Sequence, residues 1–390
     1  MLKKTPFILL ILIVVAFSCG SLLPVPLLRM FLGISVTLKS VIIFILPILI
    51  CGLLFSTFHR LGGNASRIVA MALLLLCCSN FIATYLSHFV GEAVYSSMQL
   101  SFDQISPAGE LMPLFDWQLP KIIPNALAMV LGLLGGIFIP KAMPHYVTKL
   151  SNVIDLIVAQ LLRGISWIIP PFLFGFLLKM KYDGLMALLI RQYAPVVAII
   201  IVALVIYLFL FFFFANGMQL QKTVKCLKNM IPPVLCAFGS MSSASALPYT
   251  IIAAEKNATN KSLAKSMVSM TTNVHLMGDC IAIPILIYAI LRSYGFSLPS
   301  PSLYLIFVLQ FVIAKFSVAA VPGGGIIVML PIIERCFGFN GAMSSLIFSL
   351  YILLDPICTS ANVLGNGALA QLIDGIVLRF KLAKNFTKLQ

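Results

Sequence analysis

Residues 239–245 read Gly-Ser-Met-Ser-Ser-Ala-Ser, and residues 321–325 read Val-Pro-Gly-Gly-Gly. Each stretch interrupts an otherwise apolar segment, at about 228–258 and 302–337 respectively. Irregular backbone at membrane depth is tolerated only where protein buries it or where it lines an aqueous cavity. If the chain lies in a membrane, the two interruptions therefore predict half-helices that meet around a polar site.

The composition places the chain in a membrane. Of its 390 residues, 61% are hydrophobic and 9% are charged, whereas about a quarter of a soluble domain is charged. The net charge of +15 comes from 26 basic and 11 acidic residues. The basic residues form short clusters between apolar runs, as in cytoplasmic loops, which excludes nucleic-acid binding as the main interpretation. Nine cysteines without a CxxC spacing are expected to be buried thiols rather than a disulfide framework.

Eight apolar segments are long enough to cross the bilayer, because about 20 helical residues span its ~30 Å hydrocarbon core. The predicted spans are 5–23, 37–58, 68–91, 122–143, 152–178, 193–217, 262–291 and 341–379. An alternative for the first is a signal peptide, since Lys3 and Lys4 precede its apolar part and a cleavage point lies near Cys19. We expect an uncleaved span, because the later apolar runs already commit the chain to the membrane.

The positive-inside rule indicates that the two interrupted segments do not cross. Lys228 and Lys256 flank the first, so both of its ends face the cytoplasm, and the second then enters from outside. The outer loop at about 92–121 holds the acidic residues Glu92, Asp103, Glu110 and Asp116. A full crossing by either segment would reverse the sidedness of everything after it and spoil this pattern. Both chain ends are therefore predicted to be cytoplasmic.

We predict an all-α polytopic membrane protein with eight transmembrane helices and two re-entrant helical hairpins of opposite orientation. Residues 1–217 would form a six-span half, mainly scaffold and oligomerisation surface, and residues 218–390 a transport core. Each hairpin leaves unpaired N–H groups at the start of a half-helix, which attract a carboxylate. An inverted pair of hairpin-plus-helix units is a known plan for a secondary transporter with its site at the midplane.

The last span carries a polar stripe. Its members are Asp355, Thr359, Asn362 and Asn366, which at 100° per residue fall within about 40° of one another. A carboxylate near the bilayer centre costs at least ~2.5 kcal/mol, so its default interpretation is functional. The alternative is that Asp355 lies solvated near the outer end or pairs with a lysine for packing.

The preceding span carries Thr271, Thr272, Asn273, His275 and Asp279. His275 and Asp279 are four residues apart and would share one helix face. A buried histidine beside an aspartate in a membrane predicts proton handling. The alternative is a hydrogen-bonded scaffold histidine.

These motifs resemble the dicarboxylate/amino acid:cation symporter family, also called the glutamate transporter family. Residues 242–248, Ser-Ser-Ala-Ser-Ala-Leu-Pro, look like the tip of that family's first hairpin. Residues 321–325, followed by 329–331, look like the tip of its second hairpin, and residues 355–365 like the substrate-binding stretch of its eighth helix. The similarity covers about residues 225–380. It implies a homotrimer in which the core slides as an elevator against a scaffold.

The resemblance also implies a substrate site. Asp355 would hold the ammonium group of the substrate. Thr359, Asn362 and the backbone around Ser242 and Ser243 would hold its α-carboxylate. The outer gate would be formed by Val321, Gly323, Gly324 and Gly325.

Cys358 stands where family members that carry acidic substrates have an arginine. A thiol offers no charge-assisted fork for a second carboxylate, and relatives with Cys or Thr at this place take small neutral amino acids. We therefore predict a small neutral amino acid as substrate. A Cys358→Arg variant is expected to shift uptake towards aspartate or glutamate, and an unchanged preference would argue against this register.

Other departures from the family concern the coupling ion. The seventh-helix motif Asn-Met-Asp-Gly-Thr is here His275-Leu-Met-Gly-Asp279, so Met277 replaces the sodium-ligating Asp, and Asn366 replaces the eighth-helix sodium carboxylate. A thioether is a poor ligand for a hard cation, and Asn lacks the charge. Two alternatives stay open: a weakened sodium site, or proton coupling. The candidate coupling residues are His275, Asp279, Asn273, Asn362, Asn366, Ser79 and Asn80.

We thus expect a secondary active symporter, not an enzyme, that uses no cofactor and lies in the cytoplasmic cell membrane. One rival is an acidic amino-acid or dicarboxylate carrier that finds its cation at Arg163 or Lys315. Another is a channel or a transport-inactive receptor. A third is an intramembrane enzyme with Ser242 or Ser243 as nucleophile and His275 as base, which lacks an acid to orient the base.

Overall fold

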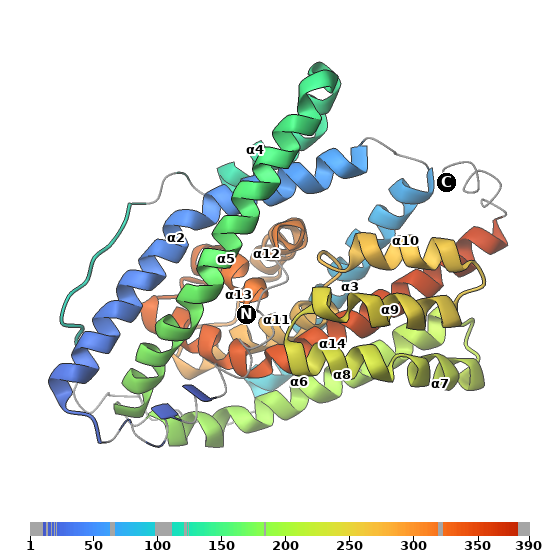
Figure 1. The fold of residues 1–390 in the computed structure, drawn as a ribbon. Coiled ribbons are helices and arrows are strands. Elements are labelled where there is room, and N and C mark those ends of the chain that lie inside the picture. The colour runs from blue at the N-terminus through green and yellow to red at the C-terminus, as the bar shows by residue number, and fades with distance from the viewer. Residues whose placement is uncertain are drawn as a thin grey trace.

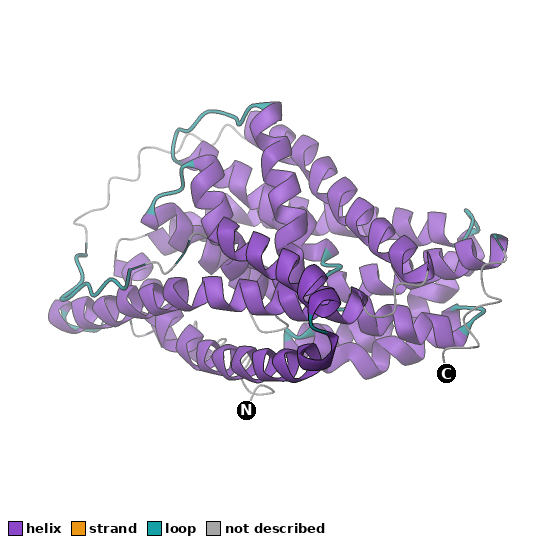
Figure 2. Ribbon diagram, turned by 90° about the horizontal axis from the view of Figure 1, so that it is seen from above, coloured by secondary structure: helices purple, strands orange, loops and turns teal. Residues whose placement is uncertain are grey.

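The computed structural model describes residues 11–12, 15–16, 18, 20, 22–62, 67–97, 111–120, 123, 125–182, 185–318 and 323–380. Over these residues the chain is helical and contains no strand (Figure 2). The helices are α2 (Val25–Gly62), α3 (Arg67–Ser97), α4 (Asn125–Ala142), α5 (Pro144–Tyr182), α6 (Leu185–Ala215), α7 (Leu220–Asn229), α8 (Ile231–Ser240), α9 (Ser243–Asn257), α10 (Lys261–Thr271), α11 (Met277–Ser293), α12 (Pro301–Ala314), η2 (Lys315–Ser317), α13 (Gly324–Phe337) and α14 (Gly341–Arg379). The first predicted span, 5–23, lies largely outside the described residues.

Several of these helices are long and apolar enough to cross a membrane. By length and hydropathy alone, the described part of the chain holds four such stretches: Val25–Ser56, Ala70–Ser96, Tyr193–Ala215 and Gly341–Arg379. Shorter apolar helices accompany them, among them Ile231–Ser240 and Pro301–Ser317. The predicted all-α polytopic membrane architecture is confirmed.

The first interrupted segment folds as a helical hairpin of α8 and α9. The chain turns at Met241, whose φ of 48° ends α8, and at Ser242, whose hydroxyl accepts a hydrogen bond from the Ser245 N–H at the start of α9. The open end of the hairpin is closed by the Asn229 amide, which donates to Asn257 Oδ1 over 2.7 Å. Both ends of the segment therefore lie together, as the sequence predicts for a re-entrant hairpin.

The second interrupted segment forms a hairpin of α12 and α13. Towards its open end, the ring of Phe307 in α12 packs against the ring of Phe337 in α13, with centroids 4.9 Å apart. At the tip, Gly323 adopts a φ of 72° directly before α13, a conformation that only glycine takes at little cost. Val321 falls outside the described residues.

Helix α14 contacts both hairpins, one near each of its ends. Near its start, the Ser344 hydroxyl donates to Glu334 of α13 over 2.8 Å. Near its end, the Gln371 amide donates to the Asn257 carbonyl at the base of the first hairpin over 3.3 Å. The two hairpins therefore approach the middle of α14 from opposite ends, and their orientation is inverted as predicted (Figure 1).

The prediction of one continuous span at 262–291 is wrong. Helix α10 ends at Thr271 and α11 begins at Met277, so residues 272–276 are unwound. Asparagine side chains satisfy the freed backbone: Asn80 donates to the Val274 carbonyl over 3.0 Å, and Asn366 to the His275 carbonyl over 3.2 Å. Unwound backbone can persist inside a membrane protein when such partners replace the missing helical bonds.

Two groups of helices pack around this centre. Helices α2, α4 and α5 pack together, whereas α3 and α6 pack against α11 and α14. Helix α11 is buried along almost its whole length. The division between these two packed groups does not coincide with the boundary after residue 217 that the sequence suggests, because α3 and α6 pack with the C-terminal helices.

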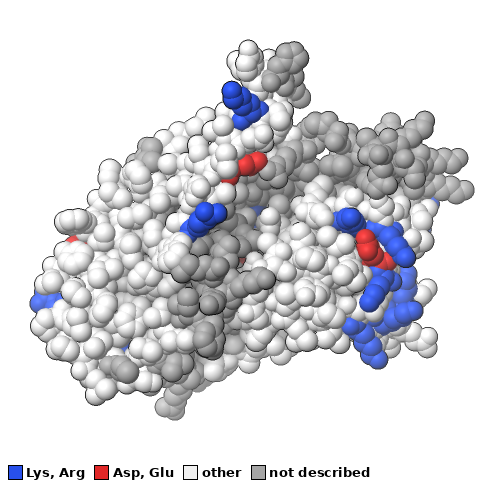
Figure 3. All heavy atoms as spheres, viewed as in Figure 1, with Lys and Arg blue, Asp and Glu red and all other residues white. Residues whose placement is uncertain are grey.

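Exposed lysines gather at one end of the molecule, where α7, α9 and α10 meet (Figure 3). They are Lys222, Lys225, Lys228, Lys256, Lys261 and Lys265. This is also the open end of the first hairpin. The cytoplasmic location that the positive-inside rule assigns to these lysines stays a prediction.

Candidate functional site

The two hairpin tips, the unwound segment and the middle of α14 surround one small cavity of about 30 Å³. Most of its lining residues are polar. They come from the two hairpin tips, the unwound segment, α11 and α14. The residues are Met241, Ser243, Thr272, Asn273, Leu276, Asp279, Val318, Gly325, Tyr351, Asp355, Thr359 and Asn362. A concave site with a few convergent polar groups, placed between broken helices, is the usual form of a small-molecule site in a transporter.

Asp355 is the carboxylate at the α14 side of the cavity. It is 4% exposed. Its Oδ2 accepts a hydrogen bond from the Gly323 N–H over 2.8 Å, and its Oδ1 accepts one from the Thr359 hydroxyl over 3.1 Å. Neither partner carries a charge, and no Lys or Arg of the described residues forms an ion pair with it. The carboxylate therefore tethers the tip of the second hairpin to α14.

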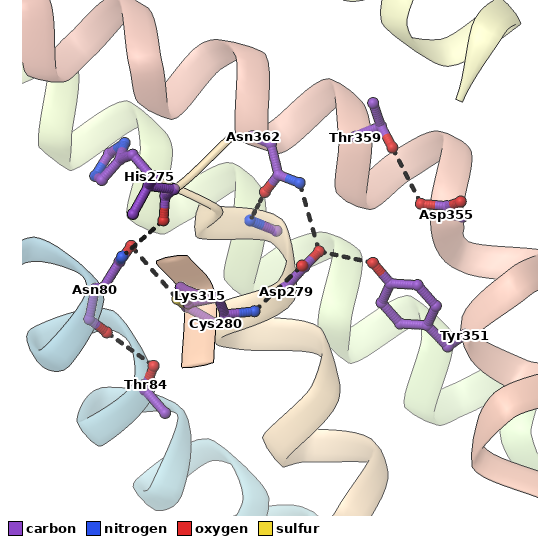
Figure 4. A network of polar contacts seen from close by, with 12 residues as sticks. Asn80, Thr84, His275, Asp279, Cys280, Lys315, Tyr351, Asp355, Thr359 and Asn362 are labelled. Carbon is purple, nitrogen blue, oxygen red and sulfur yellow. Dashed lines mark hydrogen bonds and ion pairs between the residues drawn. The ribbon is translucent and has the colours of Figure 1, made fainter. Parts of the chain in front are cut away.

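Asp279 is the second carboxylate, and it is already paired. Lys315 Nζ lies 3.2 Å from its Oδ2, and the Tyr351 hydroxyl donates to its Oδ1 over 2.8 Å (Figure 4). Lys315 is fully buried, and its ammonium lies 4.1 Å from the centroid of the Phe311 ring. An ion pair of this kind offsets the large desolvation cost of both charges.

A glycine lets the second hairpin tip approach this ion pair. A Cβ added at Gly325 would meet the carboxylate of Asp279 and would lie 2.6 Å from the Tyr351 hydroxyl oxygen. Real Cβ atoms do not come so close to other heavy atoms. The glycine run therefore serves close packing of the tip as well as the turn itself.

Asn362 connects the cavity to the unwound segment. Its Oδ1 accepts a hydrogen bond from the Gly278 N–H over 2.7 Å at the start of α11. Its Nδ2 lies 3.4 Å from Asp279 Oδ1. The amide thus fixes the N-terminus of α11 against α14.

A second group of side chains lies behind the unwound segment, and we call it the neutral cluster: Ser79, Asn80, His275, Met277 and Asn366. The His275 Nε2 is 3.0 Å from the Ser79 hydroxyl, which also donates to the Met277 sulfur over 3.8 Å. Asn366 Oδ1 accepts from the Thr271 hydroxyl over 2.6 Å. No member is a carboxylate.

The expectation that His275 and Asp279 share a helix face is wrong. Because the helix is broken at residues 272–276, His275 turns towards Ser79 of α3 and the ring of Phe211, at a centroid distance of 6.0 Å. Asp279 turns the other way, towards Lys315 and Tyr351 (Figure 4). The two side chains have separate sets of partners.

The structure brings five of the ten predicted substrate residues together in the cavity lining. Asp355, Thr359, Asn362, Ser243 and Gly325 line the cavity, as does Asn273. The remaining predicted residues do not appear in its lining: Ser242, Gly323, Gly324, Cys358, His275, Asn366, Ser79 and Asn80. Gly323 reaches the site through its N–H on Asp355.

Cys358 is fully buried. Its backbone packs directly against Gly278, where an added Cβ would lie 2.6 Å from Cys358 Cα. At this level α14 packs closely against α11, and the α14 residues that line the cavity are Tyr351, Asp355, Thr359 and Asn362 rather than Cys358.

Sequence reasoning missed Tyr351 and did not place Lys315. Tyr351 lies one helical turn before Asp355 and extends the polar stripe. An aromatic residue in an apolar run is, however, normally interpreted as part of the hydrophobic core. Lys315 is a cation in the middle of an apolar hairpin segment, which is a signal for function in a membrane. Its partner, 36 residues away, could be identified only from the fold.

The comparisons with known proteins agree with this geometry. A search of curated proteins found none that matches the sequence. The profile of the Sodium:dicarboxylate symporter family matches residues 6–376, nearly the whole chain. Members of that family are membrane transporters and not enzymes. With its two hairpins and the cavity between their tips, the chain belongs to the Sodium:dicarboxylate symporter family.

Proposed function

We propose that this transporter moves a small neutral amino acid across the membrane by alternating access. The single observation that carries the proposal is Asp355, a buried carboxylate at the cavity whose described partners are uncharged. The ammonium group of an amino acid zwitterion is the charge that such a site lacks. A charge-assisted hydrogen bond to a buried carboxylate contributes about 1.5–3 kcal/mol.

The rest of the zwitterion finds its partners on the first hairpin. Ser243 lines the cavity in the first turn of α9, where the N–H groups of the helix start favour an anion. Thr272 and Asn273 of the unwound segment add polar groups on the same side. The α-carboxylate is therefore expected to lie between α9 and the unwound segment, opposite Asp355.

The charges of the site favour a substrate with a neutral side chain. Asp279 is neutralised by Lys315, which leaves no free cation among the described lining residues for a second carboxylate. An acidic substrate would therefore face Asp279 and Asp355 unless Lys315 left its partner. Arg163 is an exposed residue of α5 and is not among the lining residues. The acidic-carrier alternative thus depends on breaking a buried ion pair, which costs about 3–5 kcal/mol.

The packing suggests which parts move. We propose that α3 and α6 travel with the hairpins, α11 and α14, while α2, α4 and α5 form the stationary scaffold and the contacts of a homotrimer. This modifies the boundary at residue 217 that the sequence suggests. Cytoplasmic chain ends and residence in the cell membrane belong to the same proposal.

Counterflow in proteoliposomes tests the function. Purified protein is reconstituted with unlabelled L-serine inside, and uptake of labelled L-serine is followed with L-alanine or L-aspartate as competitor. We expect saturable counterflow that alanine reduces and aspartate does not. Competition by aspartate at the same concentration as alanine would instead identify an acidic carrier. Ion current without saturable exchange would identify a channel, and binding without counterflow a receptor.

A further inference from the structure

Lys315 is a buried charge with a special place in the fold. It follows the last residue of α12, at the C-terminal end of that helix, and begins η2. The unsatisfied carbonyl groups of a helix C-terminus carry a partial negative charge that favours a cation. The backbone of Lys315 lies at this end, and its ammonium contacts the Phe311 ring and Asp279. It therefore occupies a position that would attract a free cation if the side chain were absent.

The neutral cluster is, by contrast, poorly suited to a sodium ion. The carbonyl oxygens of Val274 and His275 already accept hydrogen bonds from Asn80 and Asn366. Met277 contributes a thioether, which is a poor ligand for a hard cation. The nearest acid of the described residues on α11 is Asp279, and its charge is taken by Lys315.

We propose that the Lys315 ammonium is a tethered cation that takes the place of the coupling sodium. Its bond to Asp279 joins the second hairpin to α11, so the substrate binds to a core that is already charge-balanced. Binding and translocation then need no sodium. The inference rests on the proposed function for its substrate, but it concerns the ion rather than the amino acid.

The test compares two salts in three proteins. Wild type, Lys315→Ala and the neutral double variant Asp279→Asn/Lys315→Met are purified. L-serine affinity and the melting temperature are measured in sodium chloride and in choline chloride. For the wild type and the double variant, we expect affinities in the two salts within twofold of each other and equal melting temperatures. In Lys315→Ala, Asp279 loses its counter-charge, so sodium is expected to strengthen serine binding at least tenfold and to raise the melting temperature.

Each outcome either supports or overturns the inference about Lys315. A tenfold or greater increase of wild-type affinity in sodium, or a sodium-specific rise of the wild-type melting temperature, overturns the inference. A Lys315→Ala protein whose affinity and melting temperature are equal in the two salts does the same, because Lys315 would then have a packing role alone. If Lys315→Ala does not fold, the double variant decides, since a sodium requirement in it would contradict the proposal. If serine binds to no protein in either salt, the proposed function fails, while the melting temperatures still test Lys315.

Discussion

The cavity and the neutral cluster lie on opposite sides of the same unwound segment but differ in charge. Asp279 and Asp355 line the cavity and Lys315 pairs with Asp279, so these three residues have a net charge of −1 when all are ionised. The neutral cluster holds hydroxyl, amide, imidazole and thioether groups that bond to one another and to the broken backbone, while the buried Nδ1 of His275 has no hydrogen-bond partner. If the inference about Lys315 holds, charge is balanced at the second hairpin by this side chain rather than behind the helix break by a bound ion.

The largest expected effect comes from breaking the ion pair. A Lys315→Met variant leaves Asp279 buried without its counter-charge and is expected to lower the free energy of unfolding by about 3–5 kcal/mol. The double variant Asp279→Asn/Lys315→Met should recover most of that loss. Thermal melting of the single and double variants measures the coupling between the two residues. A single variant as stable as the wild type would show that the pair contributes nothing.

Removal of the Thr359 hydroxyl tests the orientation of Asp355. In Thr359→Val the carboxylate loses a donor at nearly constant volume, and a hydrogen bond to a charged group contributes about 1.5–3 kcal/mol. We expect serine affinity to fall roughly tenfold or more. The matched control is Ser360→Ala, because the Ser360 hydroxyl donates to the carbonyls of Val234 and Pro356 rather than to the site. Equal affinities of the two variants would contradict the assignment.

The contact of α11 with α14 is expected to tolerate no extra methyl group. In Gly278→Ala the new Cβ would lie 2.6 Å from Cys358 Cα, and overpacking of this kind costs about 1–3 kcal/mol. Gly375→Ala on α14 is the control, since a Cβ there meets nothing within 4 Å. We expect that control to be slightly stabilised, because alanine favours a helix over glycine by roughly 0.5–1 kcal/mol. Equal melting temperatures of the two variants would argue against the close contact.

The smallest effect is expected in the neutral cluster. His275→Gln removes a titratable group and keeps a hydrogen-bonding side chain beside Ser79, so serine counterflow should stay within about twofold of the wild type. Uptake under an imposed pH gradient should change equally little. Loss of pH-driven accumulation with intact counterflow would assign a proton relay to His275 and restore the proton-coupling alternative.

Local signals predict the two hairpins and most of the cavity. The glycine- and serine-rich interruptions and the spacing of Asp355, Thr359 and Asn362 depend on residues close together in the chain, so sequence patterns report them directly. The break between α10 and α11 leaves no such mark. Residues 272–276 contain no proline or glycine, and they unwind because amides from α3 and α14 bind their carbonyls.

The rotation of α14 and the pairing of Lys315 depend on tertiary packing. Cys358 was expected to face the substrate, yet the contact of its backbone with Gly278 keeps it out of the lining. The argument for a neutral substrate now depends on the occupied ion pair instead, and the role of Cys358 stays a prediction. The partners Asp279 and Lys315 lie on different elements, so no helical periodicity relates them.

The most direct test of the account is the binding of L-serine to Asp355→Asn beside Asp374→Asn. Asp374 is an equally buried carboxylate of the same helix, but it accepts the backbone N–H groups of Thr259 and Asn260, away from the cavity. Loss of a buried charged partner costs about 2–5 kcal/mol of binding, so we predict that Asp355→Asn weakens serine binding at least ~30-fold while Asp374→Asn changes it little. A folded Asp355→Asn protein that binds serine as tightly as the wild type would contradict the account.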